Sequence, residues 1–436
     1  LREEYLDPAG AVVKFTDFRY DAYNRLEKEF NPTYGPPASN PHFKHFAYDG
    51  KGFRTSLTDE RGHETEYTPD GLRRLVSVTH HYENAAGTVT DDHVTSYTYD
   101  HHDNLISILD ANGNETTYLY DDFRNLLESA SPDTGTTEYW YSGTRNLSRK
   151  NLADGTTVDY TYDARNRLTL VDYPDDALNI AYGYDAPGSE NGLGRLTSMT
   201  DPSGSTVFHY NALGKVSREV KTVTGVGTFE TAYGYDANGN LASVTYPDGR
   251  LVTYTIDVYD RVQAVSQELN GFRSDVVAEA AHLPNGPVTE LAFPGAVPAW
   301  QAAYGVRYQM ESLSAGAVLD RAYGFDPAGN ITAITDALVP ANSMTFGYDS
   351  LSRLETADGP WGAGGGYTYD PVGNRLTKTV SGSTTYTYTP GTNRLASASG
   401  TEPALFSHDP NGNLTGDGTH TYVYGQNQRL LGGDRR

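Results

Sequence analysis

The chain has 436 residues, a formal net charge of −23 and no cysteine. Its 56 acidic and 33 basic residues argue against nucleic acid and anionic membrane surfaces as partners, because binding a polyanion requires clustered lysine and arginine. Without cysteine there is neither a disulfide framework nor thiolate chemistry, and 34 tyrosines with 45 glycines favour strands and tight turns over helices.

From the N-terminus onwards one short pattern recurs: an aromatic residue, an aspartate, two or three variable residues, a polar residue and a leucine. Its clear copies begin at Tyr20, Tyr99, Tyr120, Tyr162, Tyr235, Phe325, Tyr348 and Tyr369. Weaker copies begin at Tyr48, Tyr141, Tyr210, Tyr388, His408 and Tyr424. The tyrosines at 99, 120, 141, 162 and 184 are spaced by 21, 21, 21 and 22 residues, and this regularity indicates a repeat architecture. We name it the Tyr-Asp pattern.

A second pattern, an aspartate followed closely by a glycine, lies between these copies. It begins at Asp7, Asp59, Asp110, Asp201 and Asp248. Threonine-rich runs with alternating polar and apolar residues follow, for example at 114–121, 155–163 and 250–257, and such alternation is typical of strands. Each repeat is therefore predicted to hold two antiparallel strands and two turns. In the turns aspartate accepts backbone hydrogen bonds, and a residue such as Gly239 takes a positive φ.

These hairpins predict an all-β fold. A lone hairpin is unstable in water, so neighbouring repeats must pair into one long twisted sheet. We expect a spiral of antiparallel hairpins that forms a partly or fully closed hollow barrel or shell. Tyr118 and Tyr120 fall on one face of their strand, so stacked repeats should line the interior with ladders of tyrosine. A β-propeller is disfavoured, because its blades need about 40 residues each.

The whole chain, residues 1–436, is interpreted as a single array, with degenerate repeats and a longer loop at about 262–322. A helical turn is possible at 274–282. Loops are expected at 31–43, 83–93, 186–194 and 362–366. No apolar run approaches the length of about 18–20 residues that a membrane helix needs, so no membrane insertion is expected.

The ends of such a spiral should expose unpaired edge strands, which pair readily with other chains. We place these edges at 12–15 and 421–424, where the sequence carries little charge. The chain opens on Leu1 within the pattern, and we expect it to be part of a longer polypeptide. The edges are then covered by flanking segments, or copies associate through them.

Several groups of residues could suggest a catalytic or metal-binding site, but each is explained more simply by a role in a turn or by a position on the surface. The loops at Asp110, Asp236 and Asp409 superficially resemble calcium loops, but their glycine is at the fourth position, not the sixth that an EF-hand requires. Paired aspartates suggest acid–base chemistry, yet turn capping explains a repeated aspartate better. His80-His81 and His101-His102 cannot chelate as adjacent pairs, because neighbouring residues of a strand point to opposite faces, and convergence of His80, His93 and His101 would require strands in register. Trp140 is interpreted as sheet packing. We expect no catalytic, cofactor-binding or metal-binding residue, and no enzyme.

The iterated words YDARNRL (162–168), YDANGNL (235–241) and YDPVGNRL (369–376) resemble the YD repeats of the Rhs proteins, the Tc-toxin BC shell and the teneurins. The resemblance covers nearly the whole chain and is weakest over 262–322. It implies a spiralling sheet around a hollow, which in bacterial relatives encloses a toxic C-terminal segment and in teneurins serves adhesion. The self-cleaving core segment of the Rhs family is not recognisable here, which implies a middle portion of a shell, or an open tube or fibre.

On this basis the chain is expected to be a non-catalytic structural shell or scaffold segment of a secreted or surface-exposed bacterial protein. Its expected partner is an enclosed or flanking polypeptide segment. The alternative is an extracellular adhesion or fibre-forming module that binds carbohydrate through its aromatic side chains, or binds another protein.

Overall fold

The computed structural model describes residues 2–6, 12–31, 42–83, 89–284 and 286–435. These residues form 41 β-strands and two short 3₁₀ helices, η2 (Asp176–Leu178) and η3 (Pro340–Asn342). Every strand pairing is antiparallel, and nearly all of them join strands that follow one another in the chain. The predicted all-β architecture of consecutive hairpins is thus confirmed.

The strands form three sheets of 24, 13 and 4 strands. The first sheet contains β1 (Arg2–Leu6), β2 (Val12–Tyr20), β3 (Leu26–Phe30), β4 (Phe43–Tyr48), β5 (Arg54–Thr58), β6 (Glu64–Pro69), β7 (Leu75–Glu83), β8 (Val89–Tyr99), β9 (Leu105–Leu109), β10 (Glu115–Tyr120), β11 (Leu126–Ser131), β12 (Gly135–Tyr141), β13 (Leu147–Asn151), β14 (Thr157–Tyr162), β15 (Leu168–Asp172), β16 (Ile180–Tyr184), β17 (Leu196–Asp201), β18 (Gly204–Tyr210), β19 (Val216–Val223), β20 (Gly227–Tyr235), β21 (Leu241–Thr245), β22 (Leu251–Ile256), β23 (Val262–Leu269) and β24 (Phe272–Val277).

The second sheet contains β25 (Glu279–His282), β26 (Val288–Ala292), β27 (Trp300–Tyr304), β28 (Met310–Ala315), β29 (Leu319–Phe325), β30 (Ile331–Asp336), β31 (Met344–Tyr348), β32 (Leu354–Gly359), β33 (Gly362–Tyr369), β34 (Arg375–Lys378), β35 (Thr384–Tyr388), β36 (Leu395–Gly400) and β37 (Ala404–Leu405). The third sheet contains β38 (Ser407–His408), β39 (Leu414–Gly416), β40 (His420–Tyr424) and β41 (Leu430–Arg435).

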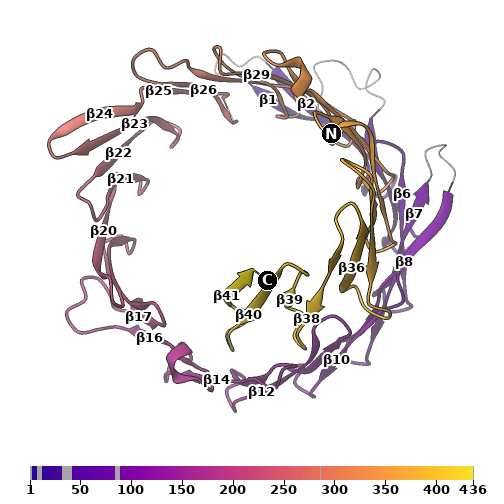
Figure 1. Cartoon of the computed structure of the whole chain (residues 1–436), viewed down its shortest axis with the longest axis horizontal. Helices are drawn as coiled ribbons and strands as arrows, with labels where there is room; N and C mark the ends of the chain where they lie inside the picture. The colour runs from indigo at the N-terminus through magenta and orange to yellow at the C-terminus, as the bar shows by residue number, and fades with distance from the viewer. Residues whose placement is uncertain (1, 7–11, 32–41, 84–88, 285, 436) are drawn as a thin grey trace.

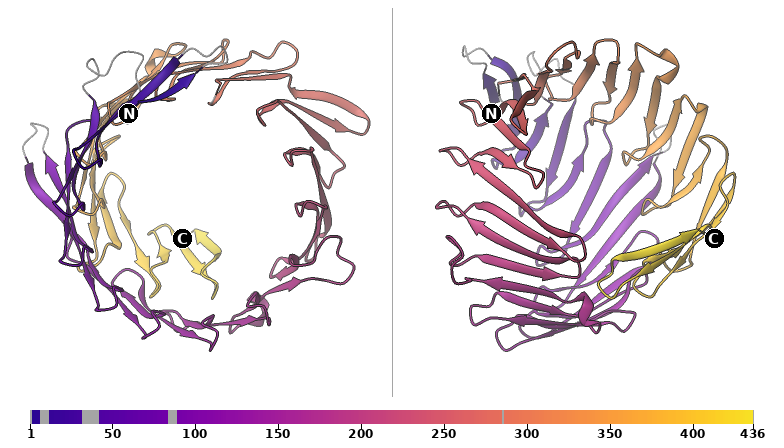
Figure 2. Two further views of the ribbon diagram at one scale, coloured as in Figure 1. Left: turned by 180° about the vertical axis from the view of Figure 1, so that it is seen from behind. Right: turned by 60° about the vertical axis from the view of Figure 1, so that its left-hand side comes forward.

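Together the sheets describe a spiral ribbon around an open centre. In the end-on view the ribbon leaves the N-terminus, passes β8, β12, β20 and β29 in turn, and then overlaps its own beginning (Figure 1). The second revolution is narrower than the first, so β38–β41 lie inside the circle that the first revolution draws (Figures 1 and 2). The wall is therefore a single layer of sheet that tapers, and not a tube of constant width.

The Tyr-Asp turns have one geometry, which Asp21 illustrates. Its Oδ1 accepts the backbone N–H groups of Tyr23 and Arg25 at 2.8 and 3.0 Å, and its Oδ2 accepts Nε of Arg25 at 2.7 Å. Asn24 takes a φ of 60°, and Gly239 takes 85° at the equivalent place. Both backbone N–H groups are bonded in the same way at Asp49, Asp70, Asp100, Asp121, Asp163, Asp257, Asp349 and Asp370. The repeated aspartate is thus a turn cap.

In many repeats, the tyrosine at the end of the strand that enters the turn connects successive repeats. Its phenol donates a hydrogen bond of 2.6 to 3.1 Å to a backbone carbonyl of the preceding repeat, usually that of the first residue of a strand, as Tyr48, Tyr99, Tyr210, Tyr235, Tyr304, Tyr348, Tyr369 and Tyr388 show. A cationic side chain often lies over the ring of this tyrosine. The guanidinium carbon of Arg25 is 4.8 Å from the centre of the Tyr48 ring, and that of Arg353 is 5.0 Å from the centre of the Tyr369 ring. The expected ladder therefore alternates tyrosine with arginine or lysine.

Several expectations about loops and edges were wrong. Residues 274–282 form β24 and β25 and not a helical turn, residues 362–366 begin β33, and residues 89–93 belong to β8. The stretch 262–322 consists of short hairpins, although the first sheet ends within it, between β24 and β25. The terminal strands are β1 and β41, which cover the strands at 12–15 and 421–424. The extra strands were missed because their sequences, REEYL and LLGGDR, lack clean alternation. The other part of the 83–93 loop, 84–88, and most of 31–43 lie outside the described residues, and the single array over 1–436 stays a prediction.

Candidate functional site: the seam and the inner wall

The two revolutions of the ribbon are joined along a line that we name the seam. On the seam, turns at one edge of the first revolution, mostly Asp-Gly turns, meet Tyr-Asp turns of the second. The contacting residues are Asn31 with Pro327, Arg61 with Asp349, Asn112 with Asp370, Asp133 with Asn393, Asp154 with Asn411 and Asp175 with Gln426. The partners are separated by 251 to 296 residues in the sequence, so one revolution of the ribbon comprises about this number of residues. The two turn patterns are thus the two complementary edges of the ribbon.

Arg61 donates three hydrogen bonds across the seam. Its guanidinium donates to the backbone oxygens of Asp349 and Ser350 at 3.0 and 3.1 Å, and to Oγ of Ser352 at 2.9 Å. Only 12% of the side chain is exposed. A largely buried cation that bonds three oxygens holds the facing turn in one position, because arginine presents its donors in a fixed fork.

Asn393 connects three turns at once. Its Oδ1 accepts the side-chain amides of Asn112 and Asn114 in the first revolution, both at 3.1 Å. Its own amide donates to Oδ2 of Asp110 at 2.8 Å, and its backbone N–H donates to Oδ1 of Asp133 at 2.6 Å. The side-chain amide of Asn393 also donates to Oδ2 of Asp133 at 3.3 Å, so it bridges the carboxylates of Asp110 and Asp133. This arrangement supports the interpretation of these aspartates as structural.

Asp154 holds the seam farther along the spiral. Its Oδ2 accepts Nδ2 of Asn411 at 2.6 Å, and its backbone N–H donates to Oδ1 of Asn411 at 3.2 Å. Burial disfavours the ionised form, but hydrogen bonds from Thr156, Asn411 and Gln428 outweigh this effect and lower the pKa of Asp154 below its ordinary value. Asp154 therefore contributes an ionised carboxylate to the seam near neutral pH.

The inner face of the wall carries the histidine pair His80 and His93. The two residues are directly opposite each other on β7 and β8, and the ring of His93 stacks on Tyr82 at 5.2 Å. They line a cavity of about 370 Å³ together with Leu351 and Arg353 of the second revolution. Burial lowers the pKa of both histidines, that of His80 further through His93 and that of His93 further through Arg353. Burial thus favours the neutral form of both rings, which face the second revolution.

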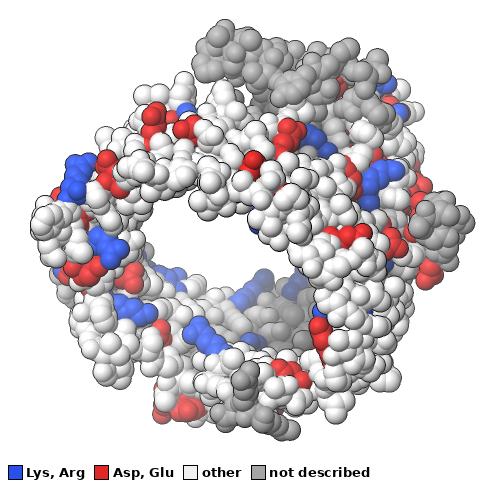
Figure 3. Space-filling view, turned by 45° about the horizontal axis from the view of Figure 1, so that its top comes forward, with Lys and Arg blue, Asp and Glu red and all other residues white. Residues whose placement is uncertain are grey.

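The same face carries the tyrosines of the repeat, since Tyr97 and Tyr99 alternate in phase with His93 along β8. The second revolution and the hollow lie on this side of β8 (Figure 1). The interior is thus lined by amphipathic phenols, as the sequence predicted. In the space-filling view the hollow is open, and acidic and basic side chains are scattered among the other residues around its opening (Figure 3).

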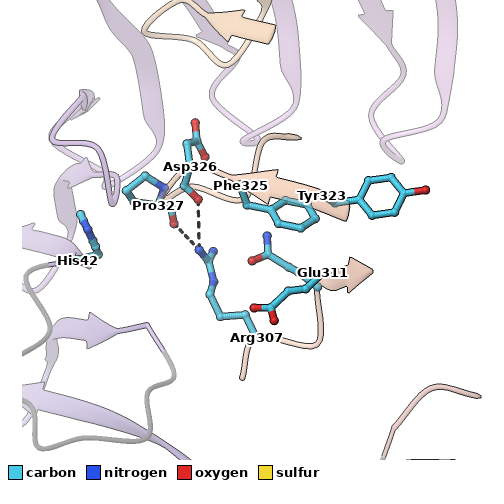
Figure 4. Close-up of a pocket in the computed structure, with 8 residues that line it drawn as sticks. His42, Arg307, Glu311, Tyr323, Phe325, Asp326 and Pro327 are labelled. Carbon is cyan, nitrogen blue, oxygen red and sulfur yellow. Dashed lines mark hydrogen bonds between the residues drawn. The ribbon is translucent and has the colours of Figure 1, made fainter. Parts of the chain in front are cut away.

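A second cavity, of about 710 Å³, lies where the seam begins (Figure 4). His42 of the first revolution faces Phe325, Asp326 and Pro327 of the second across it, and Arg307 donates to the backbone oxygen of Pro327 at 2.7 Å. This guanidinium holds a turn of its own revolution, just as Arg61 holds one across the seam. The cavity is therefore a gap between two edges of the ribbon, and Arg307, one of the polar residues that line it, stabilises a turn of the wall.

The residues that the sequence analysis weighed as possible sites of chemistry lie in turns or on the surface of the sheet. Asp110, Asp236 and Asp409 each accept a backbone N–H with Oδ1 and the amide of an asparagine with Oδ2, so both oxygens are used within the turn. The rings of His101 and His102 lie 3.8 Å apart in a turn. Trp140 is 41% exposed and is thus less packed than expected. Sequence reasoning missed Arg61 and Asn393, since no local pattern marks a partner some 260–290 residues away.

No helix in the described parts of the chain is long and apolar enough to cross a membrane. No curated protein matches the sequence. A family model described as RHS repeat matches residues 99–136, 139–178, 191–228, 219–251 and 235–268. These segments include the part of the chain where the 21-residue period is most regular.

Solved structures show the same fold. A chain of the Photorhabdus luminescens Tc holotoxin pore is similar over 96% of this chain and 24% of its own, with a TM-score of 0.76 and 16% identity. The TcdB2–TccC3 complex is similar over 99% and 28% (TM-score 0.72, 14% identity), and its form without the hypervariable C-terminal region over 98% and 27% (TM-score 0.72, 14% identity). The present chain thus spans about a quarter of those chains. The chain thus carries RHS repeats within residues 99–268, and its fold is that of the matching part of these toxin-complex chains.

Proposed function

We propose that this chain is a non-catalytic wall segment of a secreted bacterial shell, and that it encloses a polypeptide segment of the protein to which it belongs. The observation that carries the proposal is the seam. Hydrogen bonds between turns convert a spiral ribbon into a continuous wall, from Asn31–Pro327 to Asp175–Gln426. A ribbon that served only as a scaffold for a flat surface would not need to bond its own edges.

The shape of the wall favours enclosure over an open fibre. Because the second revolution is narrower, β38–β41 lie inside the circle of the first in the end-on view, and so does the C-terminal end (Figures 1 and 2). A polypeptide that follows this end would start toward the hollow. The tyrosine-lined inner face suits such a segment, since phenols offer both apolar rings and hydrogen bonds to an unfolded chain.

One edge of the ribbon, the Tyr-Asp edge of the first revolution, has no partner turn within the described residues. The Tyr-Asp edge of the first revolution exposes Tyr23, Leu72 and Phe123 by 81%, 70% and 66%, whereas Leu351, at the same turn position within the seam, is half-buried. We propose that a flanking stretch of YD-repeat polypeptide, or a second copy of the chain, covers this free edge as the seam covers its own.

A comparison of two tagged proteins tests enclosure. One carries a protease-sensitive peptide after the C-terminus and the other carries the same peptide before the N-terminus, and both are digested with a protease fixed to beads that cannot enter the hollow. We expect the C-terminal peptide to be cleaved at least tenfold more slowly, and Arg61→Met, which opens the seam, to reduce this difference. Equal cleavage rates of both peptides in the intact chain would refute enclosure.

The alternative, an adhesion module that binds carbohydrate, depends on exposed aromatic side chains such as Trp140. Stacking on a sugar requires the indole face to be free, so Trp140→Ala should abolish any saturable glycan binding. Binding of a glycan by the intact chain, together with its loss in Trp140→Ala, would favour adhesion over enclosure.

A further inference from the structure

Four charged or titratable side chains meet on the outer face of the wall, on three neighbouring strands. Glu64 and Glu66 belong to β6, His81 belongs to β7 and Asp92 to β8. Thr65 pairs with His80, which faces inward, so the two glutamates and His81 lie on the opposite, outward face. The register of the three strands therefore brings carboxylates and an imidazole together, although these groups are separated in the sequence.

The atoms of three of these side chains are close enough to share one ion. A carboxylate oxygen of Glu64, one of Glu66 and a ring nitrogen of His81 all lie within 4.8 Å of one another. Nε2 of His81 is 3.6 Å from Oε1 of Glu66. Tetrahedral zinc with bonds of about 2.0–2.2 Å separates its ligand atoms by about 3.4 Å, so small side-chain rotations of the exposed glutamates complete the geometry.

Asp92 supplies the observation that distinguishes this group from a cluster of surface acids. It is directly opposite His81 in the sheet, and its Oδ1 lies 2.7 Å from Nδ1 of the ring. A carboxylate that accepts the Nδ1 proton leaves the lone pair of neutral histidine on Nε2, the atom that faces the glutamates. Histidine ligands of zinc are commonly oriented by such a carboxylate.

From this geometry we propose that Glu64, Glu66 and His81 bind one divalent transition-metal ion of the zinc type, with Asp92 as the orienting residue and water at the open position. Imidazole nitrogen with carboxylates favours zinc, copper or nickel, whereas calcium requires six to eight oxygen ligands. The ion joins β6 and β7 directly, and β8 through the contact of Asp92 with His81, on the outer face opposite the inner cavity of His80 and His93. It therefore braces the long β7–β8 hairpin where the second revolution packs on its other face.

Titration calorimetry of the whole chain with Zn²⁺ alone tests the site. We expect one saturable site, an affinity at least tenfold weaker in His81→Ala and in the double variant Glu64→Gln/Glu66→Gln, and an unchanged affinity in the matched control His102→Ala. Asp92→Asn should weaken binding by about 10–100-fold while leaving the three ligands in place. Millimolar Ca²⁺ should not displace the ion.

Hydrogen exchange supplies a second measurement, which does not rely on the heat of binding that calorimetry records. Zn²⁺ should slow amide exchange in β6, β7 and β8 of the intact chain and leave it unchanged in His81→Ala. Equal affinity of the intact chain and His81→Ala, the absence of a saturable site, or displacement of Zn²⁺ by Ca²⁺ would each overturn the proposal.

Discussion

Replacing Arg61 with methionine should open the seam locally without unfolding the chain. The side chain is 12% exposed and donates to three oxygens of the facing turn, at 2.9, 3.0 and 3.1 Å. Hydrogen bonds from a charged donor contribute about 1.5–3 kcal/mol each, but the three share one guanidinium and are not additive, so we expect a total loss of about 3 kcal/mol. Methionine preserves the apolar stem, and the loss can therefore be assigned to the hydrogen bonds.

The assay is hydrogen exchange followed by peptide mass spectrometry on the native chain. A loss of about 3 kcal/mol raises the equilibrium constant for local opening about 100-fold, and the increase should be confined to peptides around 59–63 and 349–353. Arg61→Lys should behave like Arg61→Met, because lysine keeps the charge but loses the fork. Arg165→Met is the control, since Arg165 is 66% exposed and lies away from the seam. Unchanged exchange around 349–353 in Arg61→Met would refute the role of this residue.

Three further predictions concern the turns, the tyrosines and pH. Gly239→Val should cost about 1–3 kcal/mol and lower the melting temperature, because φ is 85° there, whereas Gly71→Ala, in open space without a positive φ, should be neutral. Tyr210→Phe should cost about 1 kcal/mol in chemical denaturation because it removes a hydrogen bond of 2.6 Å, and Tyr259→Phe, on a 64% exposed side chain, should cost nothing. Burial lowers the pKa of His93 below 6.5, so its contribution to stability is complete above that pH and is lost as the pH falls through its folded pKa. The loss of stability between about pH 7.5 and about pH 5.5 should be smaller in His93→Gln, and an equal loss would contradict this assignment.

The repeat unit itself was predictable from the sequence because its determinants are local. The cap at Asp21 and the positive φ of Gly239 depend on residues at most four positions away. The alternation at 114–121 likewise determines which side chains of β10 share a face. Local rules also explain the errors at 274–282 and 362–366, where alanine and glycine carry little strand signal and pairing with neighbouring strands decides the conformation.

The seam and the outer cluster were not predictable, for a different reason. Whether Arg61 meets Asp349 depends on the curvature and pitch of the ribbon, which accumulate over many strands. The proximity of Glu66 and His81 depends on the exact register of two strands, and a shift of one residue would move His81 to the inner face. A single sequence carries no direct signal for either quantity.

The central claim is that turns some 257 residues apart in the chain lie side by side and close the wall. Because the protein has no cysteine, the double variant Asp154→Cys/Asn411→Cys tests this contact with a short bifunctional maleimide. Ser129→Cys/Thr137→Cys, on neighbouring strands, is the positive control, and each single variant is a negative control. The account predicts a rapid intramolecular cross-link in the seam pair, at a rate within about tenfold of the positive control and independent of protein concentration. A seam pair that stays unlinked while the positive control reacts would contradict the closed wall.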